Sequence, residues 1–412
     1  MKAIISTLTI CACLVGFSQA HTIDEEPRYF GAQKGSLLET QKRIQNQDQL
    51  LYPAYQRLIA DADKAMKVKP LTVTDKITTA ISADIHDYYS TAPYLWPDPT
   101  KPDGLPYVPR DGQINPEARN PLHTDQMRIR DFGQLVESLT LAYYFSGEKK
   151  YAEKAATMLR VWYLNEDTQM NPNMNYGQAV PGLTPGRAIG IIEGSAIIYT
   201  ADAASLLKDY EGWTDNDQEG LDRWLNEYLD WLLTSDHGRL EGEMKQNHGS
   251  KYDASVARLA LVLGRNDLAK SIINDVKMKR ILLQIEPDGA QPMELRRTKG
   301  FNYSLFNLEA LIQLADLGTW IDVDLWNYET DDGRSIVKAI EFVRPYVEVL
   351  PENVPPAVWH YEQIVPIQRV KAAPIFRKAA NAKQDSSYEV IASQFSELKN
   401  RRLQLLYPAQ VM

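Results

Sequence analysis

The chain has few cysteines and an excess of negative charge. Its two cysteines, Cys11 and Cys13, both lie in the first twenty residues, so the remaining sequence can form no disulfide and offers no thiolate for catalysis. The net charge of −9 argues against a general nucleic-acid-binding protein, because such domains are usually basic. A local cluster of basic residues could still bind an anion inside an acidic protein.

Motifs for metal binding and for a nucleophilic serine are also missing. The six histidines are scattered, with no His-Glu-x-x-His motif, no paired cysteines and no EF-hand loop, so we expect neither a metal ion nor another cofactor. No Gly-x-Ser-x-Gly motif occurs. The sequence does not exclude glycoside hydrolysis, which needs a pair of carboxylates, because Asp and Glu are abundant. The loop candidates Asp98 and Asp103 are, however, typical turn residues.

The N-terminus has the layout of a secretory signal peptide over residues 1–20. Lys2 supplies the basic start, an apolar stretch follows, and a small-x-small cleavage site ends at Ala20, so we expect the mature chain to begin at His21. The apolar stretch is too short for a membrane-spanning helix. A large exported chain without cysteine fits a bacterial periplasm, so we expect a periplasmic or secreted protein.

Most of the sequence carries apolar residues at helical spacing. Residues 127–145 place apolar side chains on one stripe, a short Ser-Gly-Glu connection follows, and residues 151–162 carry a second stripe. This pattern predicts an antiparallel helix pair with a tight loop. Residues 257–275 repeat the same layout. We expect further helices near 38–67, 187–208, 217–234, 302–317 and 334–348.

Repeated helix pairs predict an all-α fold in which the pairs stack into an incomplete (α/α) toroid. No linker or change in composition divides the chain. We therefore expect a single domain over residues 21–412, closed by a helical C-terminal tail.

Two segments interrupt the helical pattern. Residues 87–122 combine many prolines with aromatic residues, which predicts a long, ordered loop. Residues 168–186 are rich in Asn, Gly and Pro. Because loops on a rigid scaffold commonly carry binding sites, both segments are candidate walls of a functional site.

Four residues suggest a chemical site. Asn247 and His248 are adjacent, and Arg296 precedes Tyr303 by seven positions at the start of an amphipathic helix. Taken singly, each has an ordinary structural explanation, such as a buried polar pair or a solvated arginine. Together they are the groups that β-elimination of a polyuronate needs. Donors from Asn, His and Arg neutralise the carboxylate beside the C5 proton, and a Tyr takes that proton, protonates the departing O4, or does both.

The chain resembles the alginate lyase superfamily of α/α-toroid polysaccharide lyases, in particular polysaccharide lyase family 38 and more distantly family 5. The resemblance covers roughly residues 85–345. Its motifs are APYLWPDP at 92–99, MNPNMNYGQAVPG at 170–182, GRAIGIIE ending at Glu193, NHGSKYD starting at Asn247, and MELRRTKGFNYSLFNLEAL ending at Leu311.

The resemblance implies a role for each matching position. Asn247 and Arg296 would neutralise the substrate carboxylate, His248 would do so and serve as a candidate base, and Tyr303 would be the catalytic tyrosine. Residues that would contact the sugar chain are Tyr94, Trp96, Asn175, Gln178 and, as a further candidate, Arg187. The chain departs from family 5 in the Gly-Ser that follows His248 and in Leu95, where an aromatic residue is expected, which leaves the sugar preference open.

The function expected from this resemblance is metal-independent β-elimination of alginate, an acidic polysaccharide of mannuronate and guluronate. Three alternatives stay open: a lyase for another polyuronate such as glucuronan, a polyuronate-binding protein without catalysis, and a glycoside hydrolase.

Overall fold

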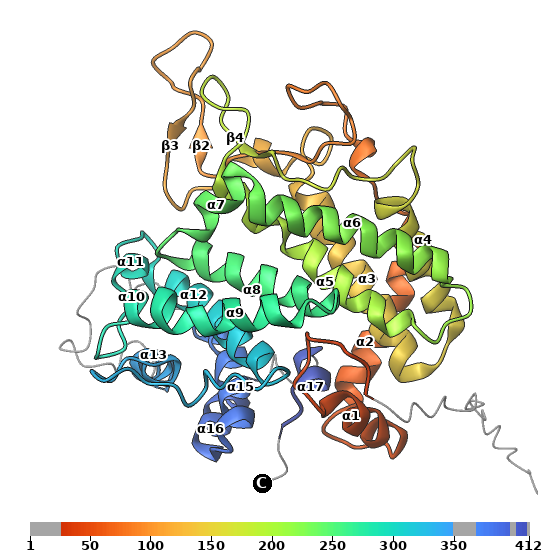
Figure 1. The fold of residues 1–412 in the computed structure, drawn as a ribbon, viewed down its shortest axis with the longest axis vertical. Helices are drawn as coiled ribbons and strands as arrows, with labels where there is room; N and C mark the ends of the chain where they lie inside the picture. The colour runs from red at the N-terminus through yellow and green to blue at the C-terminus, as the bar shows by residue number, and fades with distance from the viewer. Residues whose placement is uncertain (1–25, 349–367, 396–400, 410–412) are drawn as a thin grey trace, which may run out of the picture.

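The computed structural model describes residues 26–348, 368–395 and 401–409, which are mainly helical (Figure 1). The predicted signal peptide, with its cleavage point at Ala20, lies outside the described residues. The all-α class predicted from the repeated stripes is confirmed.

The longer helices have the following bounds: α1 Ser36–Gln45, α2 Tyr52–Ala65, α3 Gln126–Ser146, α4 Lys149–Tyr163, α5 Ser195–Ala204, α6 Asp215–Thr234, α8 Asn247–Val262, α9 Asn266–Val276, α12 Gly300–Gly318, α13 Ile336–Val343, α15 Ala373–Lys383 and α16 Ser386–Ser393. The short helices are α7 Asp236–Gly242, α10 Leu282–Gln284, α11 Pro292–Leu295, α14 Pro345–Glu348 and α17 Leu403–Leu406. The 3₁₀ helices are η1 Val73–Asp75, η2 Pro116–Arg119, η3 Ala188–Gly194, η4 Ser205–Leu207 and η9 Arg369–Lys371, and η5 Lys277–Ile281 is a π-helix.

Five helices form the inner wall of the toroid. In chain order, α3 packs against α5, α5 against α8, α8 against α12, and α12 against α15. Side chains from all five line one cavity of about 320 Å³, so these helices surround a common centre. Helices α3, α8, α12 and α15 each also pack against the next helix of the chain, namely α4, α9, α13 and α16. This is the stacking of antiparallel pairs that the sequence predicted.

The pair formed by α3 and α4 shows how the sequence builds one unit. Gly147 follows α3 with φ +72°, a left-handed conformation that glycine adopts without strain, and the chain turns back into α4. The Phe132 and Trp162 rings then stack across the pair at a centroid distance of 4.4 Å, and both are fully buried. Aromatic burial of this kind is a large apolar contribution to the core.

Three of the helices predicted from the sequence are divided into shorter segments in the structure. The stretch near 38–67 is two helices, α1 and α2, because the chain turns between them and Gln47 has a positive φ. The stretch near 334–348 is divided into α13 and α14, since Pro345 has no backbone N–H to continue a helix. The stretch near 187–208 consists of η3, α5 and η4 in succession.

That last stretch is also apolar. Ala188–Leu207 is long and apolar enough to cross a membrane by length and composition alone, but 67% of its apolar stretch is buried inside the fold. Because α5 belongs to the inner wall, its apolar character is explained by packing on several sides.

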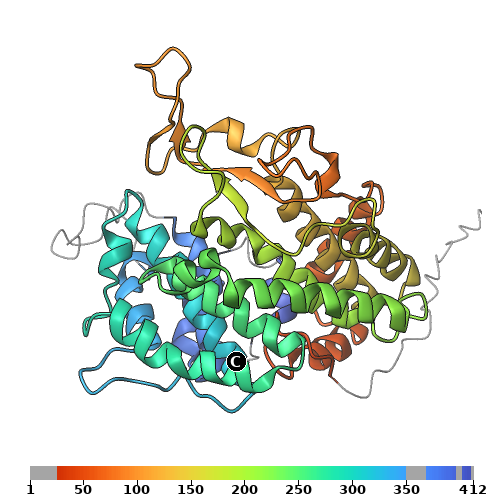
Figure 2. The ribbon, with the colours of Figure 1, turned by 45° about the horizontal axis from the view of Figure 1, so that its top comes forward.

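The two predicted loops meet at one end of the toroid. They contain the strands β1 Tyr89–Thr91, β2 Leu95–Trp96, β3 Val108–Pro109 and β4 Tyr176–Ala179. β1 pairs in parallel with β4, which joins the loops, while β2 and β3 form an antiparallel hairpin. Figure 2, with this end turned toward the viewer, shows the strands lying across the helices, whereas α1, α16 and α17 lie at the opposite end in Figure 1.

Candidate active site

Tyr303 lies in the first turn of α12, beneath the loops. It is half-buried, and its hydroxyl donates to the Tyr94 hydroxyl at 3.2 Å. Burial raises the pKa of the Tyr303 phenol, and the neighbouring Tyr94 raises it further, while the Arg297 guanidinium opposes the shift. The phenol is therefore protonated at neutral pH and sits beside a cation that would stabilise its ionised form.

The arginine beside Tyr303 is Arg297, not Arg296. Arg297 Nη2 donates to the Tyr303 hydroxyl at 2.9 Å, and its guanidinium carbon lies 4.0 Å from the centre of the Tyr303 ring. Arg296 is exposed, and its Nη1 lies 3.5 Å from the Met293 sulfur. Both residues lie between α11 and α12, where adjacent side chains point in different directions. The structure therefore does not bring Arg296 to Tyr303, and Arg297 occupies the expected position.

His248 lies in the first turn of α8 and is held by a buried carboxylate. Its Nδ1 lies 2.7 Å from Glu241 Oε1, and the Glu241 side chain is only 1% exposed. A carboxylate at this distance accepts the Nδ1 proton, so a neutral His248 presents Nε2 as a proton acceptor. The arrangement suits a base whose ring orientation is fixed.

Asn247 begins α8 and is almost completely buried. Its backbone N–H donates to Glu294 Oε1 at 2.6 Å, and its Nδ2 donates to Glu294 Oε2 at 2.7 Å and to Gln246 Oε1 at 3.1 Å. The Glu294 carboxylate thus caps the N-terminus of α8, where negative charge is favourable. In this arrangement both amide hydrogens of Asn247 already have partners within the protein.

Glu294 connects the two halves of the cluster. Burial raises the pKa of its carboxyl, while hydrogen bonds from Asn247 and the charges of Arg297 and His248 oppose that shift. The carboxyl therefore lies within electrostatic reach of both Arg297 and His248. It brings the start of α8 and the turn before α12 into one site.

The first loop is anchored directly to this cluster. Arg297 Nη2 donates to Asp111 Oδ1 at 2.7 Å, and the Thr298 hydroxyl donates to Asp111 Oδ2 at 3.1 Å. Trp96, the other predicted aromatic of this loop, donates its Nε1 hydrogen to the Gln113 carbonyl at 3.0 Å. Its indole ring faces the Arg110 guanidinium at 5.0 Å, so its contacts lie within the loop itself.

In the second loop, three predicted sugar-binding residues have partners within the protein. Buried Gln178 accepts from Arg187 at its side-chain oxygen (2.8 Å) and at its backbone carbonyl (3.0 Å). Asn175 is exposed and accepts from the Trp231 indole at 3.0 Å. Gln178 and Arg187 therefore brace the loop, and Asn175 is the one of the three that faces solvent.

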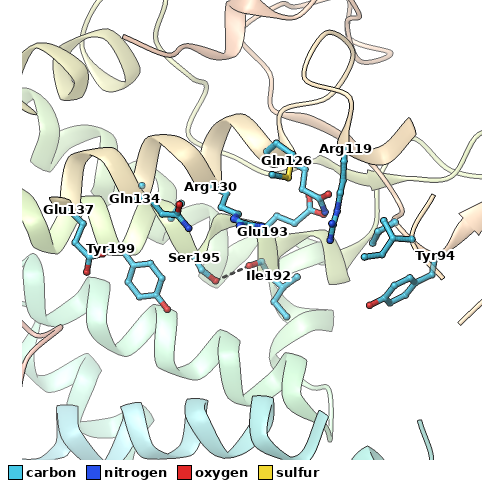
Figure 3. Close-up of a pocket in the computed structure, with 15 residues that line it drawn as sticks. Tyr94, Arg119, Gln126, Arg130, Gln134, Glu137, Ile192, Glu193, Ser195 and Tyr199 are labelled. Atoms are coloured by element: carbon cyan, nitrogen blue, oxygen red, sulfur yellow. Dashed lines mark hydrogen bonds between the residues drawn. The ribbon is translucent and has the colours of Figure 1, made fainter. Parts of the chain in front are cut away.

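A cavity of about 540 Å³ extends from Tyr94 along α3 and α5. Figure 3 shows Tyr94 at one end of it and Tyr199 toward the other. Because the Tyr94 hydroxyl contacts Tyr303, a chain bound in the cavity reaches the cluster at that end. Among the described residues, no three His, Cys, Asp or Glu side chains are placed together as metal ligands.

Sequence reasoning missed three members of this cluster: Arg297, Glu294 and Glu241. Arg297 and Glu294 lie in the same ELRR segment as Arg296, so the motif was found but its two arginines were not distinguished. Glu241 precedes His248 by seven residues, and nothing in the spacing marks it among 54 acidic residues.

A helical toroid that carries Tyr, Arg and His in one cluster, joined through Tyr94 to a cavity, has the architecture of an α/α-toroid polysaccharide lyase. The alginate lyase family model matches residues 72–354. The chain belongs to the alginate lyase family, and it is a polysaccharide lyase.

Solved structures agree with this assignment. An alginate lyase from Bacteroides ovatus is 37% identical, with a TM-score of 0.87 over 93% of this chain and 100% of that one. Alginate lyase A1-III from Sphingomonas species A1 shares the fold at 14% identity, with a TM-score of 0.56 over 87% of this chain and 97% of that one. A histidine-to-alanine variant of A1-III in complex with a tetrasaccharide gives 16% identity and a TM-score of 0.60, over 95% of this chain and 99% of that one. A comparison with curated proteins gave no match.

Proposed function

We propose that this protein cleaves alginate by β-elimination, leaving an unsaturated uronate at the new chain end. Family membership and the 37% identity to a Bacteroides ovatus alginate lyase support this proposal. The observation that carries it is the contact of Tyr303 with Arg297, in one cluster with Glu294, whose carboxyl interacts electrostatically with both Arg297 and His248.

The first requirement of the reaction is to make the C5 proton acidic. That proton lies next to a carboxylate, and abstraction leaves an enolate-like dianion. Arg297 neutralises the substrate carboxylate and so stabilises this charge in a partly buried site. His248 adds a second donor when Nε2 carries a proton, on bonds for which His248 is not the base. Asn247 contributes a third donor if the substrate carboxylate takes the place of Gln246 at its amide, because that is the longer of its two contacts.

The second requirement is to move two protons. The C5–H electron pair forms the C4=C5 double bond, the C4–O4 bond breaks, and O4 takes a proton. In mannuronate and glucuronate the C5 proton and O4 lie on the same side. Tyr303 in its ionised form, which the adjacent Arg297 stabilises, accepts the C5 proton and passes the same proton to O4. In guluronate they lie on opposite sides, so His248 Nε2 takes the C5 proton and Tyr303 protonates O4.

The test is ultraviolet absorbance of the new double bond during incubation of purified protein with polymannuronate, polyguluronate and glucuronan, each assayed separately with a chelator present. We expect absorbance to rise on at least one alginate block. Tyr303→Phe should lower the initial rate by about 10²–10⁴-fold, the usual contribution of general acid–base catalysis. Tyr143→Phe is the matched control, because Tyr143 lies on α3 and its ring packs against Tyr210. No rise on any substrate, beside an active control lyase, would refute the proposal.

Export through the N-terminal signal stays a separate prediction, resting on the sequence of residues 1–20. Mass spectrometry of protein recovered from the periplasm of an expressing bacterium should give a chain that starts at His21. Recovery of the full-length chain from the cytoplasm alone would contradict it.

A further inference from the structure

The cavity along α3 contains two arginines that the proposed reaction does not use. Arg119 ends η2, Arg130 lies on α3, and both line the cavity (Figure 3). Both are exposed, and within the described part of the chain neither side chain makes an ion pair or hydrogen bond. An arginine kept free at a cavity wall is an available partner for a carboxylate, which it can bind through two parallel N–H groups.

The two carboxylates that line the same cavity, Glu193 and Glu137, already have hydrogen-bond partners within the protein. Glu193, which lies between the two arginines in Figure 3, accepts hydrogen bonds from Tyr88 and Gln126, and its carboxyl pKa is raised by burial. Glu137, toward the far end, accepts from Tyr29 and pairs with Arg402. Between Tyr94 and Gln134 the lining therefore holds two arginines and one glutamate, so its net charge is positive even when Glu193 is ionised.

The remaining groups on this wall suit a sugar chain. Gln126, Arg130 and Gln134 follow one another at intervals of four residues, so they share one face of α3. They span about 12 Å along the helix axis, longer than a single sugar ring. Gly133 lies on the same stretch of helix, where a Cβ would come within 2.9 Å of the Ala196 Cβ, and its absence lets α3 approach α5 at the base of the cavity.

We propose that Arg119 and Arg130 bind the carboxylates of uronate residues that lie beyond the cleaved bond, on the Tyr94 side of Tyr303. This inference rests on the proposed polyuronate substrate. It adds the path that the polysaccharide takes across the protein. The subsite begins at Tyr94, follows α3 and ends before Glu137, where the available positive charge ends.

The experiment measures binding separately from turnover. Polymannuronate is titrated by calorimetry, at low and at high salt, into Tyr303→Phe protein, in which cleavage is slow enough for binding to be measured. Adding Arg119→Gln and Arg130→Gln should raise Kd by about tenfold or more, since two charge-assisted contacts are lost. The dependence of Kd on salt should also become weaker, because fewer charges are paired on binding.

Two further variants make the result specific. Arg223→Gln with Arg401→Gln changes the net charge equally at exposed positions outside the cavity, and should leave Kd within about twofold. Arg119→Lys with Arg130→Lys keeps the charge but loses the paired N–H geometry, so its Kd should lie between those of the parent and the glutamine variant.

The outcomes separate this inference from the proposed function. An unchanged Kd in the Arg119→Gln, Arg130→Gln protein, or failure of the parent to bind polymannuronate, overturns the subsite, even if wild-type protein produces the double bond. A raised Kd supports the subsite even if the wild-type protein shows no elimination, in which case only the catalytic proposal fails.

Discussion

At the scale of single residues, the choice between Arg296 and Arg297 can be tested directly. Arg297→Ala removes the donor to Tyr303, and we expect kcat/KM to fall by about 10²–10³-fold, as for loss of a transition-state donor. The kcat/KM of Arg296→Ala should stay within about twofold of the wild-type value, because the Arg296 side chain is exposed. Steady-state kinetics of the two variants provide the comparison. If Arg296→Ala loses activity and Arg297→Ala does not, Arg296 is the catalytic arginine, as its seven-residue spacing from Tyr303 predicted.

His248 should matter far more for turnover than for folding. His248→Ala removes a base and a neutralising group, so we expect kcat to fall by about 10²–10⁴-fold. The free energy of unfolding should fall by about 1–3 kcal/mol, because the buried Glu241 loses its partner. Glu241→Gln keeps a hydrogen-bond acceptor for Nδ1, so its loss of kcat should be smaller than that of His248→Ala.

Rate measurements and urea unfolding on both variants test this order. Near-wild-type turnover in His248→Ala would remove the residue from the mechanism. A larger loss for Glu241→Gln than for His248→Ala would instead show that Glu241 has a role beyond orienting the ring.

At the scale of elements, the first loop is held over the site by one carboxylate. Asp111 joins the segment after β3 to the turn before α12 through Arg297 and Thr298. Asp111→Ala should therefore lower kcat/KM by about tenfold, because a small displacement of groups that position the substrate is costly. Limited proteolysis should show faster cleavage within residues 87–122.

The matched control for this prediction is Asp103→Ala, in the same loop. Asp103 accepts from the backbone of Leu105, so its contact stays within the loop and does not reach α12. If both variants lose activity equally, the effect comes from general disturbance of the loop, and the anchoring role of Asp111 is wrong.

At the scale of the whole molecule, one buried ion pair joins the inner wall to the N-terminal segment. Asp202 on α5 accepts from Arg258 on α8 and from the backbone of Phe30, and both side chains of the pair are almost fully buried. Asp202→Ala leaves the Arg258 charge unpaired, so the free energy of unfolding should fall by about 3–5 kcal/mol.

A double variant distinguishes the effect of the unpaired charge from the effect of lost packing. Asp202→Ala with Arg258→Met removes both charges and should be more stable than Asp202→Ala alone. Urea unfolding gives the three free energies. If the double variant is the least stable, packing around Arg258 contributes more than its charge does.

The sequence by itself determined the helices and the kind of chemistry. Apolar stripes predicted α3 and α4, and the Asn-His and Arg…Tyr segments predicted the groups that we propose for elimination. These patterns are local, because residues on one helical face recur every three or four positions. A helix can therefore be predicted from its own segment without knowledge of the fold.

The tertiary structure decided which of these groups meet. Spacing could not choose between Arg296 and Arg297, because neighbouring residues in a turn point in different directions. The partner of Asn247, Glu294, lies 47 positions away, and Asp111 lies 186 positions from Arg297. Such contacts form only when the helices stack and β1 pairs with β4, so the geometry of the site is a property of the folded chain.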